Sequence, residues 1–330
     1  MPNKFEAAGR LTKSTGGLFW VLLDAGDGPL SGRKVALRAR GNLRTEGGLL
    51  PGDRVTVEYS ESSFVQTPDG VQTTEDKAGL YDASVTAVLP RKNTFIRPSM
   101  ANLDRLYLIL AATRPDPSTL VADKLLSVCE YYGVEPVIVI GKSELAPETA
   151  EHYRQLYAGV GYRTFVLSCE TGEGVAAFVS YVKETPARLL SAFIGASGAG
   201  KSTLLGKIFP EYGLRSGEVS QKTGRGRHTT RTVEVYEART ADGTCLIADT
   251  PGFSAVDFVN YDFLPSVEVL PDTMRDFLPF YKDCRWPDCS HTKEEDCGVV
   301  RAVREGKIAR SRHESYVENY MLLKQKHKWD

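Results

Sequence analysis

The chain has 330 residues, 42% hydrophobic and 25% charged, which is an ordinary composition for a globular protein of about two or three domains. Its 41 Lys and Arg residues balance 42 Asp and Glu residues, and the net charge of -1 gives no global field that would mark a nucleic-acid binder. Any basic surface must therefore be local. The apolar runs fall short of the ~20 residues that a membrane span needs, and the N-terminal sequence lacks the apolar segment of a secretory signal. We therefore expect a cytoplasmic protein that contacts no membrane.

Residues 1–92 consist of short β-rich segments separated by turns of Gly, Asp and Pro. Strands at this spacing, with no helical period between them, predict a small all-β barrel. In residues 34–40, alternation places the apolar side chains on one face and Arg38 and Arg40 on the other. A basic outer face fits binding along a phosphate backbone, although a merely solvated strand face would show the same pattern.

Residues 93–258 alternate predicted strands with predicted helices. Apolar strands are expected at 106–111, 136–140, 164–167, 189–194 and 244–248. Continuous apolar strands between amphipathic helices are typical of a parallel sheet covered on both faces. Residues 259–330 form a third region with a helical, basic tail. The predicted fold is thus multidomain, with an all-β barrel, a central α/β domain and a mainly helical C-terminal domain.

The most specific motif follows the predicted strand at 189–194 and opens the next helix. It fits G-x-x-x-x-G-K-[ST] with Gly195, Ala196, Ser197, Gly198, Ala199, Gly200, Lys201, Ser202 and Thr203. This context indicates a P-loop, whose successive N–H groups and helix N-terminus face an anion. Lys201 is expected to place its charge near the β- and γ-phosphates, where it acts in catalysis, and the Ser202 hydroxyl to ligate Mg²⁺. The chain is therefore expected to bind a nucleoside phosphate.

Two segments downstream of the P-loop suit the metal and the γ-phosphate. Asp249 ends the predicted strand at 244–248 and opens the sequence DTPG, where its carboxylate can hold Mg²⁺ through water and the Gly252 N–H can contact the γ-phosphate. Between them lies a Gly-rich, basic loop, TGRGRHTTR. We interpret this loop as a switch in which Thr229 or Thr230 reaches the metal. A solvated basic loop is the alternative.

Three thiols and one imidazole crowd into a short C-terminal stretch, at Cys284, Cys289, His291 and Cys297. In a reducing compartment such a cluster indicates metal binding before it indicates disulfides. The set is typical of structural zinc sites, because four protein ligands leave no open position for a catalytic water. We therefore expect one structural Zn²⁺ per chain that stabilises a region too small for a large core.

A guanine-nucleotide protein should also carry an N-K-x-D base motif after a strand, and none follows the P-loop. Upstream, the predicted strand at 136–140 runs into Gly141, Lys142, Ser143 and Glu144. The predicted strand at 164–167 runs into Ser168, Cys169 and Glu170, where an S-A-K base loop would be expected. The order base motif, base loop, P-loop, switch and DTPG is a circular permutation of the usual GTPase order.

That order, between a small β-barrel and a Cys/His cluster, resembles the ribosome small-subunit-dependent GTPase family (RsgA type) over essentially the whole chain. The resemblance implies an OB-fold RNA-binding domain in residues 1–92, a circularly permuted GTPase domain in 93–258 and a zinc-binding helical domain in 259–330. It also implies a GTP hydrolase that binds the 30S subunit and 16S rRNA. Such an enzyme hydrolyses GTP to GDP and phosphate under stimulation by the 30S particle, acts in late 30S maturation, and is expected here to be a monomer.

The resemblance also bears on single residues. Phe253 follows DTPG, where a water-orienting Gln stands in Ras-like proteins, so His228 is the candidate to orient or deprotonate the attacking water. A loop position or an RNA contact is the alternative for His228. The family tends to carry a Glu at the position of Glu294, whose role the sequence leaves open.

The base motif departs from the family pattern, because Gly141 replaces Asn, Glu144 replaces Asp, and Glu170 replaces the Lys of the base loop. A weaker or less selective guanine site is expected, since charge-assisted hydrogen bonds contribute ~1.5–3 kcal/mol each. An alternative function is therefore an rRNA- or ribosome-binding protein whose nucleotide switch is degenerate or relaxed in specificity. A P-loop kinase is a third candidate, but the chain shows no evident acceptor site.

Overall fold

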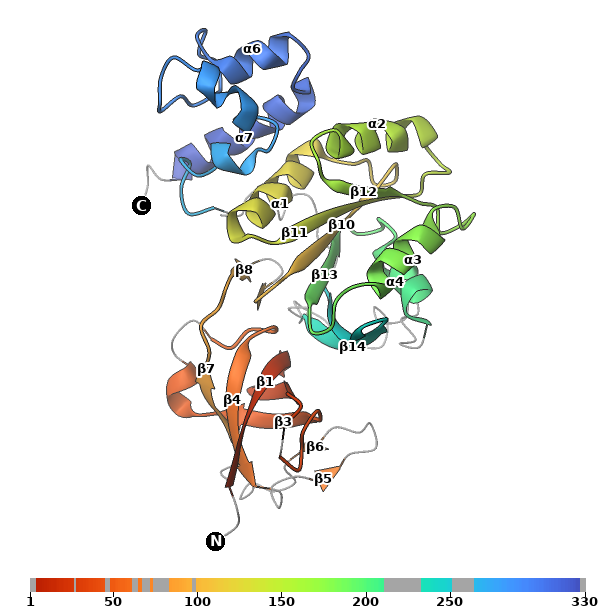
Figure 1. The fold of residues 1–330 in the computed structure, drawn as a ribbon, viewed down its shortest axis with the longest axis vertical. Helices are drawn as coiled ribbons and strands as arrows, with labels where there is room; N and C mark the ends of the chain where they lie inside the picture. Colours follow the sequence, from red (N-terminus) through yellow and green to blue (C-terminus); the bar gives the residue numbers. More distant parts are fainter. Residues whose placement is uncertain are drawn as a thin grey trace, which may run out of the picture. The chain divides into compact units, whose positions relative to one another are not determined.

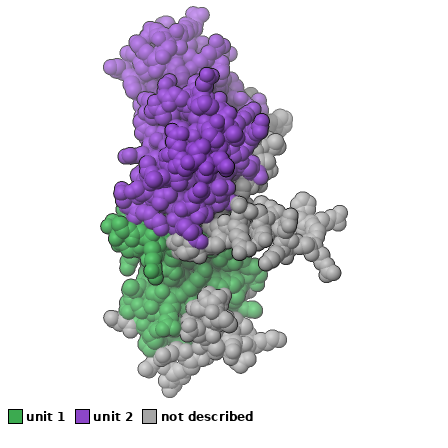
Figure 2. Space-filling model, turned by 90° about the vertical axis from the view of Figure 1, so that its right-hand side faces the viewer, with its two compact units in different colours: residues 1–104, 186–192, 225–251 green, residues 105–185, 193–224, 252–330 purple. Residues whose placement is uncertain are grey.

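The computed structural model describes residues 4–26, 28–44, 48–60, 65–66, 72–73, 83–96, 99–210, 233–250 and 264–326. The chain divides into two compact units (Figure 2). The first comprises residues 1–104, 186–192 and 225–251, and the second comprises residues 105–185, 193–224 and 252–330. Within the described ranges, no helix combines the length and the apolar character that crossing a membrane requires.

Most of the first unit is a closed five-stranded barrel. Its strands are β1 (Lys4–Thr15), β2 (Leu18–Leu23), β3 (Lys34–Ala39), β4 (Arg54–Ser60) and β7 (Ser84–Val88). The order β2-β1-β4-β7-β3 closes because β2 also pairs with β3, and the short strands β6 (Gln72–Thr73) and β5 (Val65–Gln66) extend the sheet beyond β3. Alternate side chains fill the interior, among them Leu11, Val21, Val35, Leu37, Val55 and Val57. The predicted all-β barrel is confirmed.

Strand β1 was not evident from the sequence, although it pairs with both β2 and β4. Its sequence is rich in Lys, Glu, Ala and Gly, which are depleted in strands, so its pairing partners rather than its own propensity specify it. A short hairpin of β8 (Thr94–Ile96) and β9 (Ser99–Ala101) follows the barrel, and the 3-10 helix η1 (Gly41–Arg44) lies between β3 and β4.

A six-stranded sheet carries the P-loop. Its order is β12 (Arg163–Val166), β11 (Glu135–Gly141), β10 (Arg105–Ala111), β13 (Leu190–Gly195), β15 (Gly243–Asp249) and β14 (Glu234–Thr240). Strands β10, β11 and β12 are parallel, as expected from their continuous apolar runs. Strands β14 and β15 form an antiparallel hairpin that belongs to the first unit together with residues 190–192. Strand β14 was not predicted.

The helices that accompany the parallel strands follow the predicted alternation (Figure 1). They are α1 (Thr119–Tyr132), α2 (Pro147–Ala158), α3 (Val175–Lys183) and α4 (Lys201–Ile208). Helix α1 begins at the N-cap Ser118, whose hydroxyl accepts a bond from Val121 N, and ends at Gly133 in the left-handed conformation. Ala111 at the end of β10 lies in register with Gly141 at the end of β11, so the segments that follow both strands start side by side.

The C-terminal residues form a mainly helical region within the second unit. It contains the 3-10 helices η5 (Pro271–Thr273) and η6 (Leu278–Asp283), then α6 (Gly298–Arg304) and α7 (Arg310–Lys326). Helix α7 and η5 both pack against α1, which fixes this region to the helix that follows β10 (Figure 1).

Candidate functional site

The P-loop has the strand–loop–helix geometry that its sequence predicts. It leaves β13 at Gly195, where a Cβ atom would lie 2.8 Å from the carbonyl oxygen of Ile109, so only glycine fits. Gly198 and Gly200 adopt φ values of 79° and 95°, which side chains rarely allow, and Gly200 is the N-cap of α4. Lys201 opens the helix and is buried, whereas Ser202 and Thr203 are exposed. The first N–H groups of α4 therefore border the loop, as an anion site requires.

The base motif lies at the carboxyl end of β11, beside the P-loop. A Cβ atom on Gly141 would lie 3.6 Å from the carbonyl oxygen of Ala199, and the Gly141 carbonyl accepts a bond of 2.8 Å from Ala112 N. Lys142 has a left-handed backbone with φ of 58°, and its Nζ donates to the carbonyl oxygen of Arg114. Glu144 is exposed. The structure thus brings the base motif and the P-loop together, although Gly195 lies 54 positions after Gly141 in the sequence.

The base loop lies next to the base motif. Ser143 N donates to the carbonyl oxygen of Leu167 at 3.4 Å. The next residue, Ser168, is buried, and its N–H donates to Glu173 O at 2.9 Å. Burial raises the pKa of the Cys169 thiol, while Lys207 lowers it and Glu144 raises it. Glu144 and Cys169 therefore lie within electrostatic reach of each other, on the side of the site where the base is expected.

The segment between β10 and α1 also borders this site, and no sequence motif predicted it. The Arg114 carbonyl holds Lys142 Nζ, and Pro115 Cδ lies 4.0 Å from the position that a Cβ on Gly198 would occupy. The position of this segment follows from the sheet, because the loops that follow the parallel neighbours β10 and β11 begin at the same edge.

Several predicted residues lie outside what the structure describes. His228, Thr229, Thr230 and Gly252 fall outside the described residues, and so does Phe253. Asp249 ends strand β15 as expected, but its side chain is not among those described. Their expected roles on the metal, the γ-phosphate and the water remain predictions.

The four predicted metal ligands converge. The ligand atoms of Cys284, Cys289, His291 and Cys297 all lie within 4.8 Å of one another. The Sγ atoms of Cys284 and Cys297 are 3.8 Å apart, and His291 Nδ1 lies 3.6 Å and 3.4 Å from them. Zn–S bonds of ~2.3 Å and Zn–N bonds of ~2.0 Å in a tetrahedron require ligand separations of ~3.5–3.8 Å. The donor set therefore fits Zn²⁺ in its chemistry, and the separations among Cys284, His291 and Cys297 fit its spacing.

Backbone N–H groups contact two of the sulfurs, whereas burial raises the pKa of the Cys289 and Cys297 thiols. Gly298 N donates to Cys284 Sγ at 3.3 Å and Val300 N to Cys297 Sγ at 3.4 Å, and these contacts orient the two sulfurs. Burial lowers the pKa of His291, which favours the neutral imidazole. Its ring stacks on that of Tyr281 at a centroid distance of 4.6 Å.

Glu294 has a structural role that the sequence left open. Its carboxylate accepts bonds from the backbone N–H groups of Ser290 at 3.1 Å, Thr292 at 3.0 Å and Lys293 at 3.1 Å, and from the Ser290 hydroxyl. Partial burial raises its pKa, but these hydrogen bonds outweigh burial and lower the pKa to about 2. Glu294 therefore holds the loop that presents His291, whose backbone is left-handed with φ of 54°.

Residues 88–259 match the family model described as RsgA GTPase. Two relatives named small ribosomal subunit biogenesis GTPase RsgA are similar over nearly their full lengths. The one from Caldanaerobacter subterraneus subsp. tengcongensis is 34% identical, with 97% of each chain covered, and the one from Enterococcus faecalis is 35% identical, with 96% of this chain and 95% of the relative covered. The chain belongs to the RsgA GTPase family.

Solved structures agree with this membership in the RsgA GTPase family. YjeQ from Thermotoga maritima superposes with a TM-score of 0.68 at 27% identity, covering 97% of this chain and 99% of that one. YloQ, described as a circularly permuted GTPase, gives a TM-score of 0.67 at 25% identity, covering 98% and 96%. The fold class and the family predicted from the motif order are confirmed. As a member of the RsgA family, the chain is a GTPase.

Proposed function

We propose that this GTPase acts in biogenesis of the small ribosomal subunit, binding the 30S particle late in its maturation and hydrolysing GTP to GDP and phosphate when the particle stimulates it. Full-length relatives with this named role support the ribosomal assignment. The observation that carries the nucleotide assignment is the P-loop between β13 and α4, with the base motif beside it at Ala199.

The geometry of the P-loop supports the phosphate roles, and the sequence motifs support the metal roles. The N–H groups of residues 195–203 and the start of α4 surround the phosphates, and Lys201 neutralises charge on the β- and γ-phosphates. Mg²⁺, which would supply further charge neutralisation, is assigned to Ser202, Thr229 or Thr230, and Asp249. The Gly252 N–H contacts the γ-phosphate. His228 orients the attacking water or accepts its proton. Slow hydrolysis without the ribosomal partner is the expected result.

Base recognition is assigned to the residues at the ends of β11 and β12. Glu144 accepts hydrogen bonds from the guanine edge, Lys142 packs over the base, and Ser143, Ser168, Cys169 and Glu170 complete its surroundings. Because Gly141 provides no amide, this pocket is expected to discriminate GTP from ATP less strongly than an N-K-x-D pocket does.

The Cys₃His cluster is assigned to one structural Zn²⁺ per chain. Its support is the convergence of four ligand atoms within 4.8 Å and the N–H bonds to two of the sulfurs. With four protein ligands there is no position for a reacting water, so the ion stabilises residues 259–330 and takes no part in hydrolysis.

The barrel is assigned to 16S rRNA. Arg38 is exposed on β3 while its neighbours in the strand are buried, and Arg40 is exposed and pairs with Glu58 at 2.6 Å. A strand with cations on its outer face suits phosphates along an RNA backbone. We assign residues 1–92, 93–258 and 259–330 to the three domains, and infer a cytoplasmic monomer that contacts no membrane.

Hydrolysis assays test the proposal against its alternative. Turnover of GTP, ATP and XTP is measured with and without 30S particles. GTP turnover that rises strongly with 30S supports the proposal. An rRNA-binding protein with a degenerate switch, which Gly141, Glu144 and Glu170 favour, would bind 30S particles without any rise in turnover.

A further inference from the structure

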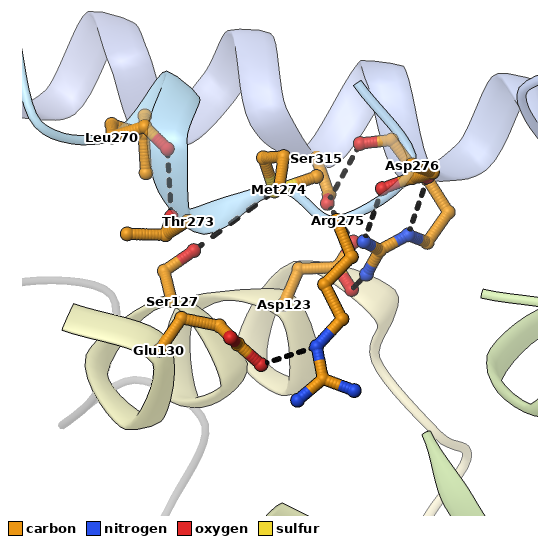
Figure 3. A network of polar contacts seen from close by, with 10 residues as sticks. Asp123, Ser127, Glu130, Leu270, Thr273, Met274, Arg275, Asp276 and Ser315 are labelled. Atoms are coloured by element: carbon orange, nitrogen blue, oxygen red, sulfur yellow. Dashed lines mark hydrogen bonds and ion pairs between the residues drawn. The ribbon is translucent and has the colours of Figure 1, made fainter. Parts of the chain in front are cut away.

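A buried ion-pair network joins the C-terminal region to helix α1. The guanidinium of Arg312 on α7 donates to both oxygens of Asp276, at 3.1 Å from Nε and 2.7 Å from Nη2, and its Nη1 donates to Asp123 Oδ1. The other oxygen of Asp123 accepts from the Ser315 hydroxyl. Figure 3 shows Asp123 on α1 facing Asp276 and Ser315 across the interface. The side chains of Arg312 and Asp123 are 0% and 1% exposed, so neither charge has water as a substitute partner.

The geometry of this network requires arginine. One planar guanidinium binds Asp276 through two parallel bonds and still reaches a second carboxylate on a different element. A lysine ammonium keeps the charge but cannot make this fork. Arg312 therefore fixes where Asp123, and with it the start of α1, lies relative to α7.

Asp123 lies close to the N-terminus of α1. The helix begins at Thr119 after the N-cap Ser118, and its first backbone bond runs from Ala122 N to Ser118 O at 3.0 Å. Only four residues therefore separate Asp123 from the N-cap. The β10–α1 segment, residues 112–117, directly precedes that N-cap residue.

Aromatic side chains of α2 provide a second connection to the same place. The Arg312 guanidinium carbon lies 5.8 Å from the ring centroid of Tyr157, and the rings of Tyr157 and Tyr153 are 6.1 Å apart. The Tyr153 hydroxyl donates to the carbonyl oxygen of Pro117 at 3.1 Å. Both connections from Arg312 thus end at the junction of the β10–α1 segment with α1.

The β10–α1 segment in turn touches two parts of the proposed nucleotide site. The Arg114 carbonyl accepts a bond from Lys142 Nζ in the base motif, and Pro115 Cδ lies 4.0 Å from the position that a Cβ on Gly198 of the P-loop would occupy. A shift at the start of α1 would move both contacts together.

We propose that Arg312 is a positioning residue for nucleotide binding, which acts through Asp123 and the start of α1 to hold the β10–α1 segment against Lys142 and the P-loop. Through this contact the zinc-binding region fixes the position of the β10–α1 segment at the nucleotide site. Nucleotide binding in turn stabilises the packing of α7 against α1. The inference rests on the proposed nucleotide site.

A second arginine of the same interface provides a matched control. Arg275 binds near the C-terminal end of α1, where its Nε donates to Glu130 at 2.7 Å. Its Nη1 donates to Gly161 O at 3.1 Å. Its guanidinium carbon lies 4.3 Å from the ring centroid of Tyr162 (Figure 3 shows the bond to Glu130). Arg275 therefore supports the docking of the C-terminal region, and these contacts, with Glu130, Gly161 and Tyr162, all lie outside residues 112–117.

The first test compares Arg312→Lys with Arg275→Lys in the full-length, zinc-loaded protein. Titration with fluorescent GDP and GTP should show that Arg312→Lys weakens binding by about 2- to 30-fold, the usual range of coupling between sites, while Arg275→Lys leaves it within about twofold. Zinc content and melting temperature are measured for both variants. Equal losses of affinity in the two variants, or none in either, would overturn the proposal.

Hydrogen exchange of the unmodified protein supplies a second test that does not depend on a variant folding. Coupling is reciprocal, so a non-hydrolysable GTP analogue should slow amide exchange at residues 310–316 of α7 as well as at residues 195–203. Slowed exchange in the P-loop alone would refute the role of Arg312 and leave the nucleotide site intact. Unchanged exchange in both segments would refute the nucleotide site itself, and the proposal with it.

Discussion

Gly141 of the base motif adjoins Ala199 of the P-loop, because a Cβ atom at position 141 would lie 3.6 Å from the Ala199 carbonyl oxygen. That distance is ordinary van der Waals contact, and the backbone of Gly141 lies in strand β11 without a positive φ. The site therefore has room for a side chain at position 141 that would contact the P-loop. Glycine makes no such side-chain contact.

Restoring the family pattern at this position should sharpen guanine recognition. Gly141→Asn with Glu144→Asp is expected to tighten GTP binding by about tenfold or more, because each recovered hydrogen bond is worth ~1.5–3 kcal/mol. ATP binding should be nearly unchanged, whereas Lys201→Ala should weaken both nucleotides. Competition binding measures these effects. Rejection of ATP by more than about ten-thousandfold in the natural protein would mean that a different residue reads guanine.

Zinc should copurify with the protein at one ion per chain. Cys289→Ser is expected to lose the metal and to unfold the C-terminal region, because the binding energy of a structural zinc is largely folding energy. Elemental analysis and thermal unfolding report the two effects. Cys129→Ser, at a buried thiol outside the cluster, is the control and should retain zinc. Protein free of zinc, or a Cys289→Ser variant as stable as the parent, would refute the assignment.

Glu294→Gln should loosen the metal site without removing a ligand. Groups that orient ligands typically alter metal affinity by about 10- to 100-fold, and competition with a chromogenic chelator measures the change. Because the folded-state pKa of Glu294 is lowered to about 2 from its usual 4.5, its stabilising contribution is present above about pH 4.5 and is lost as the pH falls toward 2. The difference in stability between parent and variant should shrink over that interval. A constant difference would contradict the role given to the charge.

Charge reversal on the barrel should weaken docking on the 30S subunit. Arg38→Glu with Arg40→Glu is expected to reduce co-sedimentation with 30S particles and to flatten its dependence on salt, since fewer counterions are released on binding. Arg154→Glu on α2, another exposed arginine, is the control. An identical salt dependence for parent and double variant would remove the barrel from the RNA interface.

Local signals made the P-loop and the metal cluster predictable from the sequence. All residues of the P-loop are contiguous, and the four metal ligands fall within 14 residues, so spacing alone identifies both. The contact of Arg312 with Asp123 spans 189 residues, and that of Lys142 with Arg114 depends on the register of β10 with β11. No local pattern carries such pairings, which explains why these contacts were not predicted.

GTP hydrolysis at residues 195–203 is expected to be controlled by the small ribosomal subunit. Phosphate release from GTP, measured for the parent and for Lys201→Ala with and without 30S particles, tests it most directly. We predict slow release by the parent alone, a strong acceleration by 30S particles, and little release by Lys201→Ala in either condition. A parent rate that 30S particles leave unchanged, or a Lys201→Ala variant as active as the parent, would contradict the account.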